Sequence, residues 1–231
     1  MMNNGMTAVS AMSVALLIAG CAMTGSSGTT ASTTPAGTSK PAKPAATAAA
    51  PARKPDRLEN IPLVWKPTTS VAKFGVIDLT GLSDTKVQID PVADNRGERG
   101  FIGQNSEKQP ARKVTTQDSV AAFATEHMKE LFSGAGISVV DSGGSAVLKS
   151  EIQQFFVDET ETYKGDVRFK ISVTDAGGKL VWSGITGGTA TRFGRSYKAD
   201  NYYETLSDSF IQAVFNLLHN PGFRTALAGG S

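Results

Sequence analysis

The clearest pattern in the chain is an alternation of apolar and polar residues over positions 167–174. The apolar positions are Val167, Phe169, Ile171 and Val173, and the polar ones are Arg168, Lys170, Ser172 and Thr174. A period of two is that of a β-strand with one face in a core and the other in water. Residues 175–178, Asp-Ala-Gly-Gly, predict a turn, so residues 179–192 are expected to return as the second strand of a hairpin.

Shorter apolar runs predict four more strands. Residues 70–79 are rich in Val, Phe and Ile and end at a glycine turn, and residues 86–92 resemble them. A short strand is expected over 137–140 and a long one over 146–157. Residues 93–112 are polar and rich in glycine and charge, so we expect a long loop there.

Apolar residues spaced three and four apart predict two helices. The first is expected to begin with a capping box formed by Thr115 and Asp118 and to end at Gly134. The second is expected over about 201–219, with Asn201 as its cap. This order of elements, dominated by hairpins, predicts an α+β fold: a two-layer sandwich of a mostly antiparallel sheet with two helices packed on one face.

The segment before residue 58 lacks such patterns. Residues 22–55 are almost entirely Ala, Thr, Ser, Gly, Pro and Lys, with almost no larger aliphatic side chain. Such a segment cannot bury enough apolar surface to offset its chain entropy. We therefore predict a signal peptide over 1–20, a disordered tether over 21–57 and a single α+β domain over 58–231.

Charge divides along the same boundary. The whole chain carries +2, but its basic residues up to position 57 give that part +4 and leave the remainder at −2. A nucleic-acid-binding protein should concentrate positive charge on its folded part, so that class is not favoured. Basic residues on the tether can contact an anionic membrane surface, or they can merely keep the tether soluble.

The only cysteine, Cys21, directly follows the apolar run Leu-Leu-Ile-Ala-Gly at positions 16–20. This segment resembles the lipobox of bacterial lipoproteins. The resemblance implies a diacylglyceryl group on Cys21, cleavage after Gly20 and acylation of the new amino end, which together anchor a protein stably. Ala22 in place of an aspartate implies sorting to the outer membrane, with the domain facing the periplasm.

Two other interpretations of the first segment remain open. A transmembrane helix needs about 20 apolar residues, whereas positions 9–22 supply 14 residues that include Ser, Met and Gly. An ordinary secretory signal also fits a short apolar run, but it leaves Cys21 unexplained.

Motifs for catalysis or metal binding are missing from the sequence. It has two histidines, no zinc-ligand spacing and no Gly-x-Ser-x-Gly elbow, so we expect no enzyme activity, metal or cofactor. His127 is interpreted as a partly buried structural residue and His219 as a helix-end residue. Asp158, Glu159 and Glu161 are interpreted as a solvated strand end.

One group of side chains is a candidate binding site. Basic and aromatic residues gather between the last strand and the last helix, where they could hold a carboxylate, phosphate or sugar, or an acidic patch of a partner. Alternatively, the aromatic rings close the core edge and the cations remain in water. This 192–203 cluster consists of Arg192, Phe193, Arg195, Tyr197, Lys198, Tyr202 and Tyr203.

Several features together resemble the YajG family of envelope lipoproteins. They are the lipobox, a strand that runs into Asp94-Asn95-Arg96, a helix that ends in a glycine turn, the segment Tyr-Lys-Gly-Asp-Val-Arg-Phe-Lys-Ile at 163–171, and the closing helix. The resemblance covers roughly residues 70–220. It implies an envelope lipoprotein without an established catalytic activity.

The leading hypothesis is a non-enzymatic, lipid-anchored envelope protein that binds a partner protein or a cell-wall component. A second hypothesis is an accessory subunit of an envelope lipid or solute transport system, which would hold an apolar ligand between sheet and helices. An enzyme would require a cleft with converging titratable groups.

Overall fold

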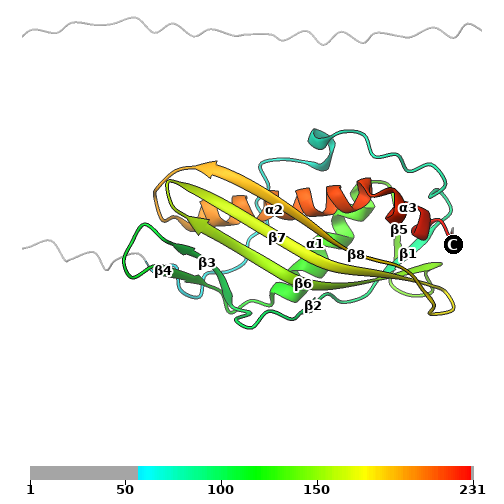
Figure 1. The fold of residues 1–231 in the computed structure, drawn as a ribbon, viewed down its shortest axis with the longest axis horizontal. Helices are drawn as coiled ribbons and strands as arrows, with labels where there is room; N and C mark the ends of the chain where they lie inside the picture. The colour runs from blue at the N-terminus through cyan, green and yellow to red at the C-terminus, as the bar shows by residue number, and fades with distance from the viewer. Residues whose placement is uncertain (1–56, 230–231) are drawn as a thin grey trace, which may run out of the picture. The chain divides into compact units, whose positions relative to one another are not determined.

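One mixed sheet of eight strands runs through residues 57–229, the part of the chain that the computed structural model describes (Figure 1). The expected signal peptide, Cys21 and all of the expected tether except Arg57 lie outside these residues. Three strands of 14 residues each form an antiparallel meander: β6 (Ala146–Glu159), β7 (Thr162–Asp175) and β8 (Leu180–Phe193). The hairpin predicted from the alternating residues is confirmed.

The other edge of β6 pairs with three short strands in succession, and all three run parallel to it. These strands are β1 (Lys86–Ile89), β2 (Ala93–Asp94) and β3 (Phe101–Asn105). β5 (Ser138–Val140) pairs parallel with β1, and β4 (Arg112–Thr115) pairs antiparallel with β3.

By its strand pairings the sheet is therefore largely parallel, and the prediction of a mostly antiparallel sheet is wrong. The physical reason is that β1, β2 and β3 follow one another along β6 in the same direction, and the chain reaches β6 only after β4, α1 and β5. A parallel pair needs such a crossover connection, which a pattern of hairpins does not reveal.

Two local predictions are also wrong. Residues 70–79 form a 3₁₀ turn, η1 (Val71–Phe74), followed by chain outside the ladder, with Val76 94% exposed. Ile77 and Leu79 instead pack against the core from a loop. Residues 93–112 are not one loop, because they contain β2 and β3.

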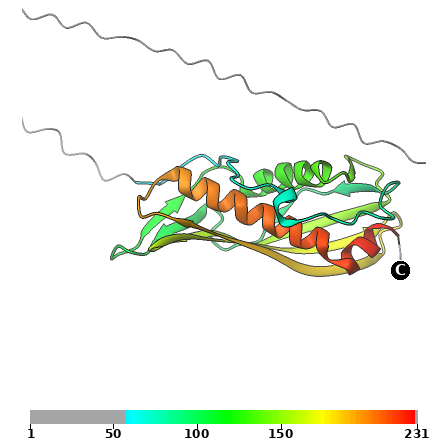
Figure 2. The same ribbon diagram turned by 90° about the horizontal axis from the view of Figure 1, so that it is seen from above.

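Helices α1 (Val120–Gly134) and α2 (Ala199–His219) cover one face of the sheet, as predicted (Figure 2). The predicted caps are wrong: Ser119 Oγ accepts from Ala122 N at 3.1 Å, and α2 begins without a side-chain cap. A third helix, α3 (Pro221–Leu227), was not predicted. Among residues 57–229, no helix is long and apolar enough to cross a bilayer.

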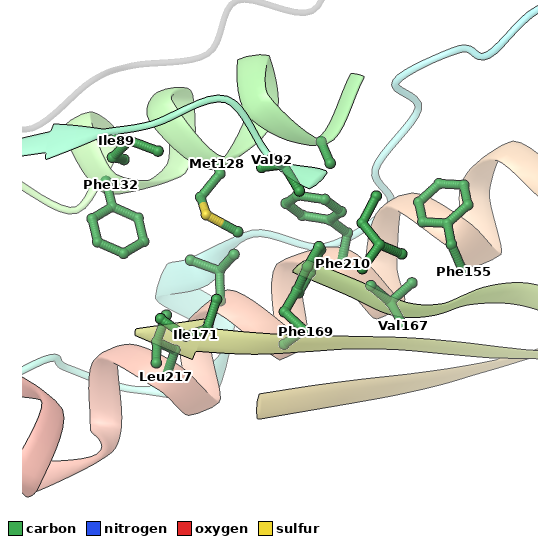
Figure 3. Close-up of a cluster of buried hydrophobic side chains, with 14 of the residues drawn as sticks. Ile89, Val92, Met128, Phe132, Phe155, Val167, Phe169, Ile171, Phe210 and Leu217 are labelled. Atoms are coloured by element: carbon green, nitrogen blue, oxygen red, sulfur yellow. The ribbon is translucent and has the colours of Figure 1, made fainter. Parts of the chain in front are cut away.

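The core fills the space between the sheet and these helices (Figure 3). All four apolar positions of the alternating segment are fully buried there. Phe169 of β7 meets Phe210 of α2 edge-to-face, with ring centroids 5.2 Å apart. Met128 and Phe132 of α1 complete the layer from the other helix.

Helix α2 lies very close to β8 because glycine occupies the crossing point. A Cβ atom at Gly188 would stand 2.2 Å from Ser209 O and 2.3 Å from Ala213 N. Next to this crossing, Gln212 Oε1 accepts from Thr189 N, and Asn216 Nδ2 donates to Gly187 O, both at 2.8 Å. These two amides cap backbone groups of β8, which in the described part pairs only with β7.

Residues 58–70, here called the N-terminal strap, cross the outside of the helix layer (Figure 2). Ile61 N donates to Thr115 O at 2.9 Å, and Lys66 N donates to Ser207 Oγ at 3.0 Å. Between them, Trp65 stacks on His127 with ring centroids 4.1 Å apart. The strap thus ties β4, α1 and α2 together, and His127 packs in the structural role expected for it, more deeply buried than predicted.

Candidate functional site

The 192–203 cluster lies at the end of the domain where α2 begins, next to the β3–β4 hairpin (Figure 1). The fold sorts its aromatic residues into opposite environments. Phe193 is 93% exposed, whereas Tyr202 and Tyr203 are buried against the core edge. Phe193 is therefore a surface residue, and the two tyrosines of α2 have a structural role.

Carboxylates of the same chain already neutralise both arginines of the cluster. Arg192 NH2 lies 2.5 Å from Glu204 Oε2. Arg195 contacts Glu107 Oε1 at 3.1 Å and Glu161 Oε1 at 2.8 Å. The sequence did not indicate these pairs, which leave Lys198 as the cluster's cation without an ion pair among the described residues.

Glu204 also joins the cluster to the N-terminal strap. Lys66 Nζ lies 3.0 Å from Glu204 Oε1 and 2.8 Å from Asp200 Oδ1. The hydrogen bonds to Asp200 and then to Glu204 raise the pKa of Lys66 above its ordinary value. The beginning of α2 is thereby held between β8 and the strap.

A buried carboxylate lies beneath the cluster. Glu159, at the end of β6, is fully buried and accepts from Tyr202 Oη at 2.8 Å and from Tyr197 N at 2.9 Å. Its interpretation as a solvated residue is wrong, because both donors reach it from a distant part of the chain. Asp158 is half-buried as well and accepts from Gln104 Nε2 at 3.2 Å, while Glu161 is exposed.

The pKa of Tyr202 makes an alkaline test possible. Burial raises this pKa far above its ordinary value, and the hydrogen bond to Glu159 acts in the same direction. Above a pH of about 10 the unfolded chain loses the Tyr202 proton and the folded chain keeps it, so stability should fall by about 1.4 kcal/mol per pH unit. Below that pH this contribution is constant.

Urea unfolding at pH 9, 10 and 11 measures the slope, which Tyr202→Phe should reduce by that amount. If stability falls equally steeply with pH in wild type and in Tyr202→Phe, the alkaline loss of stability does not come from Tyr202.

Tyr197 connects the cluster to the β3–β4 hairpin. Its hydroxyl donates to Lys113 O at 3.0 Å and accepts from Leu58 N at 3.4 Å. Its φ of 43° is uncommon for a residue other than glycine, so these contacts hold it in a strained conformation. The guanidinium of Arg112 lies over its ring, 5.5 Å from the centroid.

The Tyr197 ring forms one wall of a groove of about 670 Å³. The groove separates the β3–β4 connection from the start of the described chain. The 192–203 cluster included only Tyr197 of its lining. The basic residues on both sides of Pro110 could have indicated this groove from the sequence, but Lys108 and Arg112 lie in the segment 93–112 that was predicted to be a loop. The lining consists of Arg57, Glu59, Lys108, Gln109, Pro110, Ala111, Arg112, Lys113 and Tyr197.

A second hollow, of about 580 Å³, lies near the bulge of β6 and includes Arg96 in its lining. Arg96 donates three hydrogen bonds to Asp94, at 2.8 to 3.2 Å, and one to Phe155 O at 3.0 Å. Burial opposes ionisation of Asp94, but these hydrogen bonds outweigh it and keep its pKa below the ordinary value. The Asp94-Asn95-Arg96 segment therefore has a structural role here.

Among residues 57–229, no three His, Cys, Asp or Glu side chains are grouped so that they could hold a metal ion. No family profile matches the sequence. No curated protein matches it either.

Solved structures share parts of the fold at low identity. A protein of the DUF330 family from Xanthomonas campestris is 12% identical, with a TM-score of 0.44 over 76% of this chain and 94% of its own. PelC from Paraburkholderia phytofirmans, a dodecamer, is 15% identical, with a TM-score of 0.38 over 60% of this chain and 87% of its own. Lipoprotein GNA1162 from Neisseria meningitidis is 12% identical, with a TM-score of 0.29 over 51% of this chain and 90% of its own. Likenesses of this size assign no function, and the resemblance to the YajG family stays a prediction.

Proposed function

We propose that this chain is a lipid-anchored protein of the bacterial cell envelope that binds a partner protein or a cell-wall component and catalyses no reaction. The observation that carries the proposal is the single cysteine, Cys21, placed directly after a short apolar run that ends in Ala19 and Gly20. Acyl chains on that thiol would anchor the protein at a membrane surface. Ala22 supports the outer membrane, and the resemblance to the YajG family belongs to the same proposal.

The end of the domain at the 192–203 cluster is the proposed partner-binding face. Phe193 stands almost free in solvent, and Lys198 lies nearby in the chain without an ion pair among residues 57–229. An exposed aromatic side chain is typical of contact surfaces, and Lys198 can pair with a carboxylate of the partner. Arg192 and Arg195 hold the chain of this face in place, because each forms an ion pair with a carboxylate, Glu204 and Glu107 respectively.

The packing favours this proposal over the transport-subunit hypothesis, which requires room for an apolar ligand between sheet and helices. In the described residues, aromatic rings fill that layer, including Phe155, Phe169 and Phe210 (Figure 3).

Metabolic labelling with palmitate tests the anchor. The full wild-type chain should incorporate label and sediment with membranes, and Cys21→Ser should lose both properties. Thr24→Ala, a change just beyond the apolar run, is the matched control and should behave as wild type. The anchor is refuted if wild type takes up no label or if Cys21→Ser takes up as much.

A further inference from the structure

The groove beside Tyr197 carries positive charge that the fold does not neutralise. Four basic side chains line it, against one carboxylate, Glu59. Within the described chain, Lys108 and Arg112 have no carboxylate partner, although the arginines of the neighbouring cluster are paired. Of the remaining two, Arg57 lies 3.7 Å from Glu59 and is largely exposed, and Lys113 lies 3.4 Å from Glu98.

The arrangement of these cations suits an oxyanion. Arg112 is held against the ring of Tyr197, whose hydroxyl is fixed by Lys113 O and Leu58 N. A guanidinium held in place in this way keeps its planar set of donors available for phosphate oxygens at a reduced entropic cost. Lys108 adds an exposed ammonium on a flexible side chain to the lining of the groove.

The dimensions limit what can bind. A volume of about 670 Å³ is in the range of small-molecule sites and admits a phosphate together with a small polar group. Six of its nine lining residues carry charged or amide side chains, so the groove suits a headgroup better than an acyl chain.

The position of the groove in the chain indicates where its ligand comes from. Arg57 is the first described residue and lines the groove, and Arg53 and Lys54 precede it in the sequence. In the sequence, a basic stretch of Arg53, Lys54 and Arg57 therefore leads from Cys21 into the domain, and its last residue lines the groove. Positive charge in this sequence segment and in the groove matches the negative potential of an anionic leaflet.

We propose that the groove docks the domain onto a bilayer by binding phosphate groups of anionic lipid headgroups. Lys108 and Arg112 are the main contacts, and Tyr197 positions the guanidinium. The inference adds to the proposed function a second, charge-dependent membrane contact by the domain itself.

A vesicle assay in trans tests the groove. The full chain is reconstituted in phosphatidylcholine nanodiscs, so that its apolar segment or acyl chains already lie in a bilayer. The nanodiscs are then floated with separate vesicles of phosphatidylcholine, with or without about 30% phosphatidylglycerol. Binding should occur only to the anionic vesicles and should disappear in concentrated salt.

Substitutions assign the binding to the groove. The pair Lys108→Ala and Arg112→Ala should lower vesicle affinity about 30-fold, and Lys108→Ala alone, at an exposed loop position, about fivefold. The control pair Lys149→Ala and Lys179→Ala removes the same charge from exposed positions outside the groove and should change affinity about twofold or less.

Three outcomes would overturn the proposal. They are the lack of binding to anionic vesicles, an equal loss in both double variants, and displacement by millimolar inorganic phosphate, which would assign the groove to a free anion. Because every variant in this assay keeps Cys21, vesicle binding reports on the groove, and the palmitate experiment alone reports on the anchor.

Discussion

Replacing Gly188 with alanine is expected to lower the free energy of unfolding by about 3–5 kcal/mol. The new Cβ would stand 2.2 Å from Ser209 O and 2.3 Å from Ala213 N. Both atoms belong to the backbone of α2, so no side-chain rotation can relieve the clash. The helix would have to move away from β8, and its packing on Phe169 would loosen. Urea unfolding followed by circular dichroism measures the loss.

The neighbouring glycine provides a matched control. A Cβ at Gly187 would meet Arg168 Cγ at 3.2 Å, and that arginine side chain is 58% exposed, so it can shift by the few tenths of an ångström that the contact needs. Gly187→Ala should therefore cost about 1 kcal/mol or less. Equal losses for the two variants would show that α2 does not rest on β8 at this crossing.

Glu159→Ala is expected to destabilise the protein by about 3–5 kcal/mol. Truncation would leave the buried hydroxyl of Tyr202 and the backbone N–H of Tyr197 without an acceptor. These groups join the end of β6 to the β8–α2 connection and to α2, so the loss should be largest at this end of the domain. Thermal and urea unfolding would show it, and hydrogen exchange would locate it.

Two variants bracket this effect. Glu161→Ala removes a carboxylate of the same strand connection that is 81% exposed, so it should cost no more than about 0.5–1 kcal/mol. Glu159→Gln keeps one acceptor oxygen and should fall between the two. If Glu159→Ala is as mild as Glu161→Ala, the carboxylate does not hold the connection in place.

The sequence predicted the long antiparallel strands because a two-residue period over many positions has one interpretation. The side chains of β7 satisfy it with four fully buried apolar residues. Short strands give no such signal: β2 has two residues, and its pairing with β6 depends on a segment far along the chain. Conversely, residues 70–79 have a strand-like composition, but the fold provides them with no neighbouring strand.

The candidate site was predictable only where its residues are close in sequence. The 192–203 cluster is brought together by the β8–α2 connection itself. Its carboxylate partners Glu107 and Glu161 come from other loops, so the pairing of Arg195 could not be inferred. The same applies to Glu159, whose donors lie 38 and 43 positions further along the chain.

The N-terminal strap determines how the domain would respond to mechanical tension arriving along the chain from its amino end. Such a force would first load the two backbone hydrogen bonds that Thr115 makes with Leu58 and Ile61. The strap would then lose its contacts one after another as far as Trp65. The strap would therefore detach from the domain before the sheet unfolds.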